Sequence, residues 1–310
     1  MNKINKIYNL YKEFGMKLIA AKIISKFNYN KRISMIYKVL IEDIVKDMNH
    51  DFIEENPQLI QVEKEDFKIF VFWWQGRDEL PQIVRLCIDS IEKNSKPFSV
   101  HIITKNNYEK YVQISPIIKN KLISGDITLT HFSDILRFNL LYQYGGVWLD
   151  ATIFLTSPII FHEEIYTSSL FTQKFTRGKK IDANNPSYGR WAGFCMSTNI
   201  IHHPLFYFGK KFFDMYWGKH NVLIDYFLID YLILIGYNNI PFVKREIDKI
   251  PVNNTDIFWL MDNINNQYEG GCLEKWSVIK KRTWIFKMSY KKPLIMNTNT
   301  FFYQIMNREK

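Results

Sequence analysis

The segment that most constrains this chain runs from Ser133 to Thr152 and reads SDILRFNLLYQYGGVWLDAT. Ser133 is a favoured N-cap residue, and a helix is predicted from it to about Tyr144. Two consecutive glycines then end the helix, because glycine readily adopts the left-handed conformation that closes many helices. The residues after them, Val147 to Leu155, are almost all apolar and predict a buried strand.

The preceding part of the chain alternates strands and helices. Residues 67–73 are typical of a buried strand, residues 80–94 of a helix with Pro81 in its first turn, and residues 98–104 of a second strand. This strand–helix–strand order predicts a parallel sheet with a crossover helix, and so an α/β protein. Residues 105–127 predict short helices, and residues 127–132 a short strand.

The first 60 residues predict a basic, helical N-terminal extension, and residues 61–310 the main domain. Six apolar residues recur at helical spacing: Met16, Ile19, Ala20, Ile23, Ile24 and Phe27. Lys17, Lys22 and Lys26 lie off this stripe. Two interpretations remain open. The helix either lies on an anionic membrane surface or packs against the main domain with its lysines in water.

The net charge of +10 is concentrated at the two ends of the chain. Residues 1–40 hold nine Lys or Arg and one acid, and residues 275–292 hold seven Lys or Arg and no acid, so the remainder is net acidic. This distribution argues against a nucleic-acid-binding protein, whose basic residues usually cover one binding face. The C-terminal basic segment is either a lid that closes over phosphates, within residues 275–310, or a solvated surface strand. Within this segment, side chains that alternate between the two faces of a strand can point Lys287 inward.

Three widely spaced cysteines, Cys87, Cys195 and Cys272, predict reduced thiols rather than disulfides or a zinc site. No signal peptide is recognisable. The longest apolar run, residues 222–237, contains two aspartates and is short for a membrane span. We therefore expect a cytoplasmic protein, peripheral on the inner face of the cell membrane if its N-terminal helix binds lipid.

Three charged residues of the 133–152 segment are candidates for chemistry. Asp134 and Arg137 are three residues apart and share one helix face, either as a plain ion pair or as a pair aimed at a polar ligand. Asp150 interrupts the apolar strand after a Gly-Gly turn that allows close approach of a ligand. A carboxylate there suits a hard divalent cation, which prefers oxygen ligands and shares them with phosphates.

Other candidates are weaker. Residues 191–197 predict a strand that either lines a pocket or fills the core. The adjacent His202 and His203 are interpreted as surface imidazoles in a turn rather than a metal pair. Asp225 and Asp230 fall in a predicted apolar helix, where one of them is expected to face a cleft. Asp225 is the preferred choice of the two.

The combined string from Ser133 to Thr152 resembles that of capsular polysaccharide synthesis glycosyltransferases. It is more distantly similar to fungal Golgi mannosyltransferases and to glucosylating toxins, which share a sugar-binding region with an Asp-x-Asp motif. The similarity is strongest over residues 67–157 and weaker as far as residue 237. It implies a GT-A fold, a Rossmann-like mixed sheet flanked by helices that binds the nucleotide at the carboxyl ends of its strands.

The resemblance also implies roles for individual residues. Catalysis would involve Asp134, Arg137, Asp150 and Asp225. The pocket for a nucleotide-sugar, with a UDP-sugar favoured, would be formed by Phe72, Trp73, Trp74, Gln75, Gly76, Asp134, Arg137, Gly146, Trp148, Leu149, Asp150, Ala151 and Lys287, with Trp73 stacked on the base. Asp150 and Thr152 would bind Mn²⁺ or Mg²⁺. Thr152 departs from the Asp-x-Asp pattern and offers only a neutral oxygen.

The expected function is that of a retaining glycosyltransferase acting on a growing capsular or exopolysaccharide repeat unit that is lipid-linked. Retention comes from the resemblance, as does a leaving phosphate that accepts the proton of the acceptor hydroxyl. One alternative is a non-catalytic sugar-nucleotide or glycan-binding module, motivated by Thr152. Another is a toxin-like transferase that modifies a protein, although the chain has no recognisable delivery segment.

Overall fold

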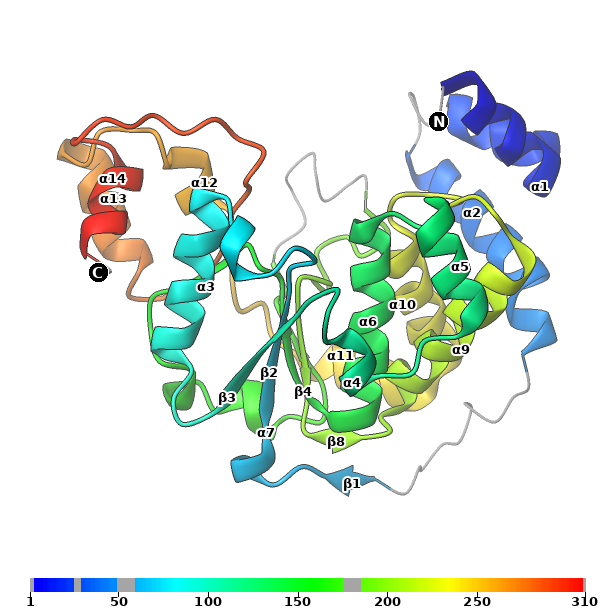
Figure 1. Ribbon diagram of the computed structural model, residues 1–310, viewed down its shortest axis with the longest axis horizontal. Coiled ribbons are helices and arrows are strands. Elements are labelled where there is room, and N and C mark those ends of the chain that lie inside the picture. The colour runs from blue at the N-terminus through cyan, green and yellow to red at the C-terminus, as the bar shows by residue number, and fades with distance from the viewer. Residues whose placement is uncertain (1–2, 25–28, 49–58, 176–184, 309–310) are drawn as a thin grey trace.

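The computed structural model describes residues 3–24, 29–48, 59–175 and 185–308. A five-stranded sheet of order β3-β2-β4-β7-β6 lies at its centre (Figure 1). Its parallel strands are β2 (Lys68–Phe72), β3 (Ser99–Ile103) and β4 (Gly146–Leu149), and its antiparallel strands are β6 (Phe171–Thr172) and β7 (Cys195–Thr198). The expectation of a mixed sheet flanked by helices is confirmed.

Helices cover both faces of this sheet. α3 (Gln82–Asn94), which connects β2 to β3, lies on one face (Figure 1). α6 (Leu129–Tyr144), which leads into β4, lies on the other, backed by α9 (Pro204–Lys219) and α10 (Leu228–Asn239). The short helices α4 (Tyr108–Tyr111), α5 (Pro116–Ser124) and α11 (Pro241–Lys249) lie on the same side, and α7 (Glu164–Thr167) lies near the lower edge of the sheet.

Alternation along the strands divides the apolar residues between two cores. In β2, Phe70 packs into the core shared with α6 and α9, whereas Ile69 and Val71 pack into the core shared with α3. In β4, Trp148 belongs to the first core and Val147 to the second. Successive strand residues point to opposite faces, so a sheet covered on both sides needs a nearly continuous apolar run.

Two further two-stranded sheets lie beside the central sheet. β1 (Ile60–Gln61) pairs with β8 (Ile200–Ile201), and β5 (Ile153–Leu155) pairs with β9 (Ile285–Lys287). Next to β9 lie α12 (Trp259–Asn263), α13 (Gly270–Ile279) and α14 (Phe301–Arg308). Trp276 of the basic segment is buried and stacks on Trp259 with ring centroids 5.8 Å apart, so this part of the segment is packed core rather than a solvated surface strand.

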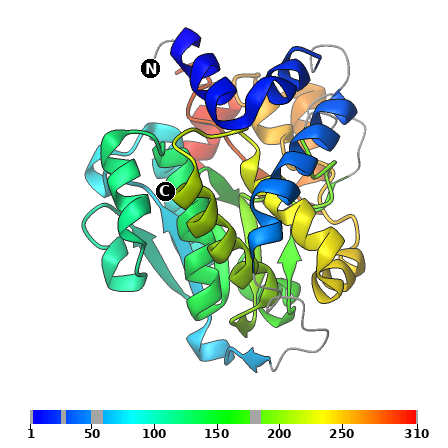
Figure 2. The same cartoon turned by 90° about the vertical axis from the view of Figure 1, so that its right-hand side faces the viewer.

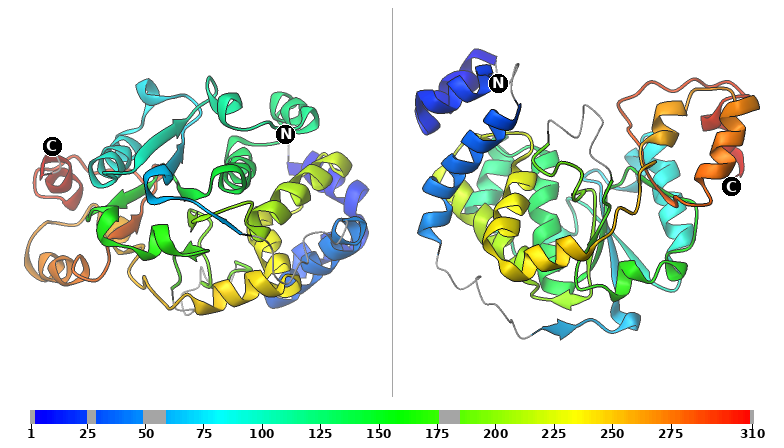
Figure 3. Two further views of the ribbon diagram at one scale, coloured as in Figure 1. Left: turned by 90° about the horizontal axis from the view of Figure 1, so that it is seen from below. Right: turned by 180° about the vertical axis from the view of Figure 1, so that it is seen from behind.

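The N-terminal helices pack on the α9–α10 side of the molecule. α1 (Lys3–Ile24) is kinked at Gly15 and buries Leu10 and Leu18, and α2 (Tyr29–Asp43) buries Ile33, Ile36 and Leu40. Figure 2 views the molecule from this side, and in Figure 3 these helices lie opposite the C-terminal helices. Of the predicted stripe, Met16 is exposed and Ile19 and Ala20 are half-buried, and Phe27 and Lys26 lie outside the described residues.

In the described part of the chain, no helix is both long enough and apolar enough to cross a membrane.

The structure corrects three local expectations in the 127–155 region. α6 begins at Leu129 with Thr128 as its N-cap, so residues 129–132 are helical rather than a strand. Ser133 lies inside the helix, where its hydroxyl donates to the Thr130 carbonyl at 2.6 Å. The strand predicted for residues 147–155 is broken by a turn at 150–152, closed by the Ile153 amide donating to the Asp150 carbonyl at 2.9 Å. This turn moves Asp150 out of the strand and past its carboxyl end.

The Gly-Gly pair serves packing rather than ligand approach. Gly145 and Gly146 both have positive φ, and they lie at the amino end of β4, away from Asp150. A Cβ on Gly146 would lie 2.3 Å from the Lys68 carbonyl oxygen of the neighbouring strand. Only glycine therefore allows the chain to turn out of α6 and pair at once with β2.

We predict that Gly146→Ala destabilises the protein by roughly 2–4 kcal/mol, because the methyl group meets backbone and the φ is strained. Gly218→Ala is the matched control. Gly218 lies in α9 with no atom within 4 Å of its hypothetical Cβ, so alanine should be neutral or stabilising by up to about 1 kcal/mol. Urea denaturation of both variants measures the difference, and equal stabilities would contradict this account of β4.

Candidate active site

A cavity of about 300 Å³ opens where β2 and β4 end. From β2 the chain crosses over one face through α3 to β3, and it returns to β4, on the other side of β2, through α6 on the opposite face. Ligands of open α/β sheets bind at such a reversal, at the carboxyl ends of the strands. The cavity is lined by Phe72, Trp73, Trp74, Gln75, Pro81, Leu129, Thr130, Ser133, Trp148, Asp150, Ala151, Thr152 and Tyr290.

A second cavity of about 380 Å³ adjoins the first, and the two share Thr130, Ser133 and Asp150. It lies between α6, the residues before β7, and the start of α10. Its other lining residues are Asp134, Arg137, Phe175, Asn185, Ser187, Trp191, Ala192, Gly193, Phe194, Tyr226, Phe227, Ile229, Asp230, Phe258 and Lys287. Asp150 thus stands at the junction of an aromatic cavity and a more polar one.

Three donors hold the Asp150 carboxylate. Oδ1 accepts hydrogen bonds from Trp148 Nε1 at 2.9 Å and from Arg137 Nη2 at 3.1 Å, and Oδ2 accepts one from Lys287 Nζ at 2.6 Å. Burial raises the pKa of Asp150, but the charges of Lys287 and Arg137 and the hydrogen bonds outweigh it and hold the pKa well below its ordinary value. Asp150 is therefore ionised at every physiological pH.

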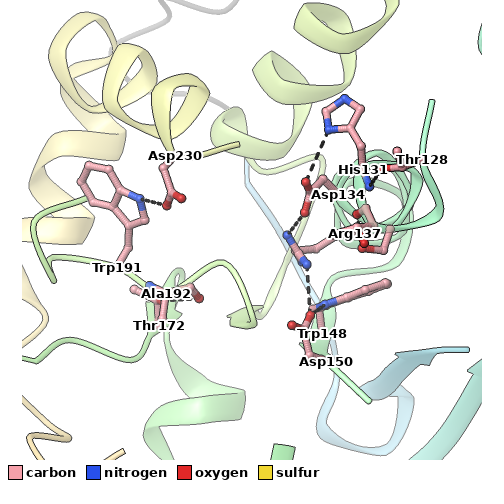
Figure 4. A network of polar contacts seen from close by, with 12 residues as sticks. Thr128, His131, Asp134, Arg137, Trp148, Asp150, Thr172, Trp191, Ala192 and Asp230 are labelled. Atoms are coloured by element: carbon pink, nitrogen blue, oxygen red, sulfur yellow. Dashed lines mark hydrogen bonds and ion pairs between the residues drawn. The ribbon is translucent and has the colours of Figure 1, made fainter. Parts of the chain in front are cut away.

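Arg137 links Asp150 to α6 (Figure 4). Its Nη1 donates to Asp134 Oδ1 at 2.8 Å, and its guanidinium carbon lies 4.9 Å from the ring centroid of Trp148. The network extends beyond Asp134. Asp134 Oδ2 lies 3.5 Å from His131 Nδ1, and His131 Nε2 accepts a hydrogen bond from Trp217 Nε1 at 3.0 Å. The predicted Asp134–Arg137 ion pair is confirmed, and both side chains also line the second cavity.

Lys287 reaches Asp150 from β9, which lies 137 residues further along the chain. Its Nζ also donates to Thr152 Oγ1 at 2.8 Å. The neighbours Phe286 and Met288 are buried, and only 20% of the Lys287 side chain is exposed. The expectation that alternation points Lys287 inward is confirmed.

Asp230 faces these cations from the other side of the second cavity (Figure 4). Its carboxyl group accepts hydrogen bonds from Trp191 Nε1 at 3.0 Å and from Asn185 Nδ2 at 2.9 Å. Burial raises the pKa of Asp230 to about 7, assisted by the negative charge of Asp134 and opposed by these two donors. Asp230 can therefore carry a proton near neutral pH and exchange it with a ligand.

The side chains around Asp150 do not fit a resident divalent cation. Both carboxylate oxygens already accept hydrogen bonds from cationic groups, and the Thr152 hydroxyl accepts from Lys287. Within the described ranges, no group of three or more His, Cys, Asp or Glu side chains converges as metal ligands. A magnesium ion that is shared with substrate phosphates needs only one or two protein carboxylates, so what competes with it here is the hydrogen bonding of Asp150 and Thr152 to Arg137 and Lys287. The expectation of Mn²⁺ or Mg²⁺ at Asp150 and Thr152 stays a prediction without support from the donor set.

The structure brings most of the predicted pocket residues together. Those that line one or both cavities are Phe72, Trp73, Trp74, Gln75, Asp134, Arg137, Trp148, Asp150, Ala151, Thr152 and Lys287. Gly76, Gly146 and Leu149 do not line them. Gly76 lies at the start of a 3₁₀ turn (Arg77–Glu79), and Leu149 is buried in the second core.

Asp225 does not line either cavity, and Asp230 does. Sequence periodicity placed both aspartates in one helix, but α10 begins only at Leu228. Asp225 lies before it, where Oδ1 accepts from the Phe227 amide at 3.0 Å and Oδ2 lies 4.0 Å from Arg32 Nε of α2. The chain turns between the two residues, so they point in different directions.

The expectation for the two histidines is half right. His202 is exposed in a turn, whereas His203 is buried and caps α9, its Nδ1 accepting from the Leu205 amide at 3.1 Å. Burial lowers the pKa of His203 to about 3, which fits this neutral, accepting role. Residues 191–194 form a loop before β7 instead of part of a strand, and this loop lines the second cavity.

Several lining residues carry no recognisable signal in the sequence. Tyr290 contacts Trp73 edge to face, with ring centroids 5.6 Å apart, although their positions are more than 200 residues apart. Asn185 and Tyr226 lie in loops without a motif. Trp73 Nε1 is buried and has no hydrogen-bond partner in the part of the chain that the structure describes.

A family model matches nearly the whole chain. Residues 17–306 match the family model described as capsular polysaccharide synthesis protein. The O-glycosyltransferase braB of Annulohypoxylon truncatum is 29% identical over 99 residues, and the glycosyltransferase afumC of Aspergillus fumigatus is 27% identical over 96 residues. These matches cover 29% and 28% of this chain, and 24% and 25% of the two relatives, so the chain aligns with about a quarter of their length.

Among solved structures, the bifunctional glycosyltransferase WbbM in its apo form is similar to 90% of this chain. The similarity covers 57% of the WbbM chain, with a TM-score of 0.43 and 10% sequence identity.

We predict that Asp230→Asn removes a pH-dependent part of the stability. A carboxyl whose pKa rises from 3.8 to about 7 on folding favours the folded state when protonated, so its contribution is complete at low pH. That contribution is lost as pH rises toward 7, with a limiting slope of about 1.4 kcal/mol per pH unit. Urea denaturation between pH 5 and 8 should show the unfolding free energy of wild type falling relative to that of the variant up to about pH 7 and levelling off above it. Exposed Asp262→Asn is the control, and a pH-independent difference for Asp230→Asn would contradict the assignment.

Proposed function

The chain belongs to the capsular polysaccharide synthesis protein family, and from this we propose that it is a glycosyltransferase that uses a nucleotide-sugar donor. We propose a GT-A type of fold and a UDP-sugar as the favoured donor. The observation that carries the proposal is the position of Asp150 at the junction of two cavities, with Arg137 and Lys287 bonded to it from the second cavity. A nucleotide-sugar carries a base, a charged diphosphate and a sugar in this order. The aromatic first cavity, the cations bonded to Asp150 and the more polar second cavity suit these three parts in the same order.

In the proposed complex the nucleotide occupies the first cavity. Trp73, Trp74 and Tyr290 provide aromatic surface for the base. The location at the carboxyl ends of two parallel strands is the usual one for nucleotides on such sheets. The diphosphate then lies over Asp150, where Arg137 and Lys287 supply positive charge.

The sugar and the acceptor occupy the second cavity. Asp134 and Arg137 on one side, and Asp230 with Asn185 on the other, offer charged and neutral hydrogen-bonding groups to sugar hydroxyls. We propose that the acceptor hydroxyl attacks from the face that the nucleotide leaves, with retention of configuration, and that the leaving phosphate takes its proton. Arg137 and Lys287 lower the barrier by stabilising the negative charge that develops on that phosphate.

The proposed acceptor is a growing capsular or exopolysaccharide repeat unit on a lipid carrier. A non-catalytic binding module and a protein-modifying transferase are the alternatives. Slow hydrolysis of the donor without acceptor separates an enzyme from a binding module. Transfer to a glycan lipid rather than to a protein separates the two enzymes.

We predict that one class of nucleotide-sugar raises the melting temperature of the protein and that Trp73→Ala abolishes the shift. Loss of base stacking costs on the order of 1–3 kcal/mol, which weakens binding by roughly 5- to 150-fold. The measurement is a thermal-shift screen of UDP- and GDP-sugars, run both with EDTA and with Mn²⁺. Phe161→Ala, a ring that is 74% exposed and outside both cavities, is the control. If no nucleotide-sugar shifts the wild type in either condition, the transferase proposal fails.

We further propose that the N-terminal helices place the enzyme on the cytoplasmic face of the cell membrane. α1 leaves Ile7, Tyr8, Tyr11 and Met16 exposed, while Leu10 of the same helix is buried. The first 40 residues are strongly basic. Exposed apolar side chains on a basic helix favour binding to anionic lipid headgroups.

We predict that replacing Ile7, Tyr8 and Tyr11 with serine lowers binding to vesicles of anionic phospholipid several-fold without unfolding the protein. The three side chains are exposed, so the core around Leu10 is untouched. Co-flotation with vesicles measures the effect. Ile123→Ser on α5, which removes an 85% exposed apolar side chain elsewhere, is the control. Unchanged binding of the triple variant would show that α1 serves packing alone.

A further inference from the structure

We propose that Lys287 takes the place of the divalent cation that the family resemblance implies, so that the donor diphosphate binds here to protein cations without a metal. This inference rests on the proposed nucleotide-sugar donor and specifies how its phosphates are held. The two predicted metal ligands, Asp150 and Thr152, are both hydrogen-bonded to the Lys287 ammonium group instead.

The positions of the atoms exclude a metal and the ammonium group from the same place. Lys287 Nζ lies 2.6 Å from Asp150 Oδ2 and 2.8 Å from Thr152 Oγ1. A magnesium ion bound by the same two oxygens would lie about 2.0–2.1 Å from each, and it would compete with the ammonium group that now bridges them. Two cations cannot occupy one position, and moving the ammonium group away would leave it buried beside a second positive charge.

The backbone fixes Lys287 in this position. The Lys287 amide donates to the Ile257 carbonyl at 2.8 Å, and the Met288 amide donates to the Thr152 carbonyl at 2.8 Å. Lys287 also stands opposite Ile153 in the β5–β9 pair. The lysine is therefore part of a paired strand with buried neighbours, and it lies next to the Asp150 turn without any closing motion.

The four charged side chains cancel one another before any ligand binds. Arg137 and Lys287 carry two positive charges, and Asp134 and Asp150 two negative ones. Lys287 uses two of its three N–H groups on Asp150 and Thr152, which leaves one for a ligand. Arg137 and Lys287 both line the second cavity, and Asp150 borders both cavities, so a diphosphate that joins the two must pass these cations.

The experiment measures nucleotide affinity by calorimetry for wild type, Lys287→Gln and Lys287→Arg, in EDTA and in Mn²⁺. UDP and GDP are the probes, and uridine and guanosine are phosphate-free controls. We expect wild type to bind one diphosphate equally well, within about twofold, in both buffers. Loss of a charge-assisted hydrogen bond should weaken its binding to Lys287→Gln at least about tenfold, and leave the nucleoside unaffected. Lys287→Arg, which keeps the charge, should retain metal-free binding.

Lys287→Gln keeps a polar side chain that can donate hydrogen bonds but removes the charge. Lys281→Gln, at an exposed position, controls for loss of a lysine in the same basic segment. The melting temperature reports folding of each variant. Diphosphate binding that requires Mn²⁺ would overturn the inference and leave the transferase intact. Equal diphosphate affinity of Lys287→Gln and wild type in EDTA would overturn it too, since the lysine would then be structural. Failure of every nucleotide to bind in either buffer would instead reject the proposed function together with this inference.

Discussion

The organisation of this protein depends on the ionised carboxylate of Asp150 and the groups that hold it. Arg137 from α6 and Lys287 from β9 lie within hydrogen-bonding distance of its two oxygens. Only 4% of the Arg137 side chain is exposed, and removing one partner of such a buried pair typically costs about 3–5 kcal/mol. The helix before β4 and the strand near the C-terminus are therefore fixed relative to each other by the same group that marks the centre of the site.

The sheet explains why this group lies at a ligand site. β2 and β4 are parallel neighbours that end at one edge, and their connections run over opposite faces. The two cores on these faces hold the strands rigidly. The turns that follow the strands lie outside the cores and can therefore contain polar side chains. The positions of Trp73 and Asp150 therefore depend on the packing of other residues in these two cores. A rigid scaffold of this kind keeps the geometry of a charged site constant without bound ligand.

The two sides of the second cavity differ in character. On the α6 side, Asp134 and Arg137 are charged and paired, whereas on the α10 side Asp230 is partly protonated near neutral pH. Two carboxyl groups with different partners in one cavity can play different roles toward one ligand. Asp134, bonded to Arg137, can orient hydroxyl groups, and Asp230 can both donate and accept a proton.

The sequence alone determined the local features that follow from periodicity and backbone preference. The strand at β2, the helices α3 and α6, the glycine stop at residue 145 and the pairing of Asp134 with Arg137 all rest on neighbours in the chain. Only the tertiary structure decided which side chains meet across long separations. Lys287 and Asp150 are brought together by the pairing of β5 with β9, and Asp230 rather than Asp225 reaches the cavity because the chain turns before α10. Periodicity carries no information about such turns and pairings, since they are set by the packing of distant elements.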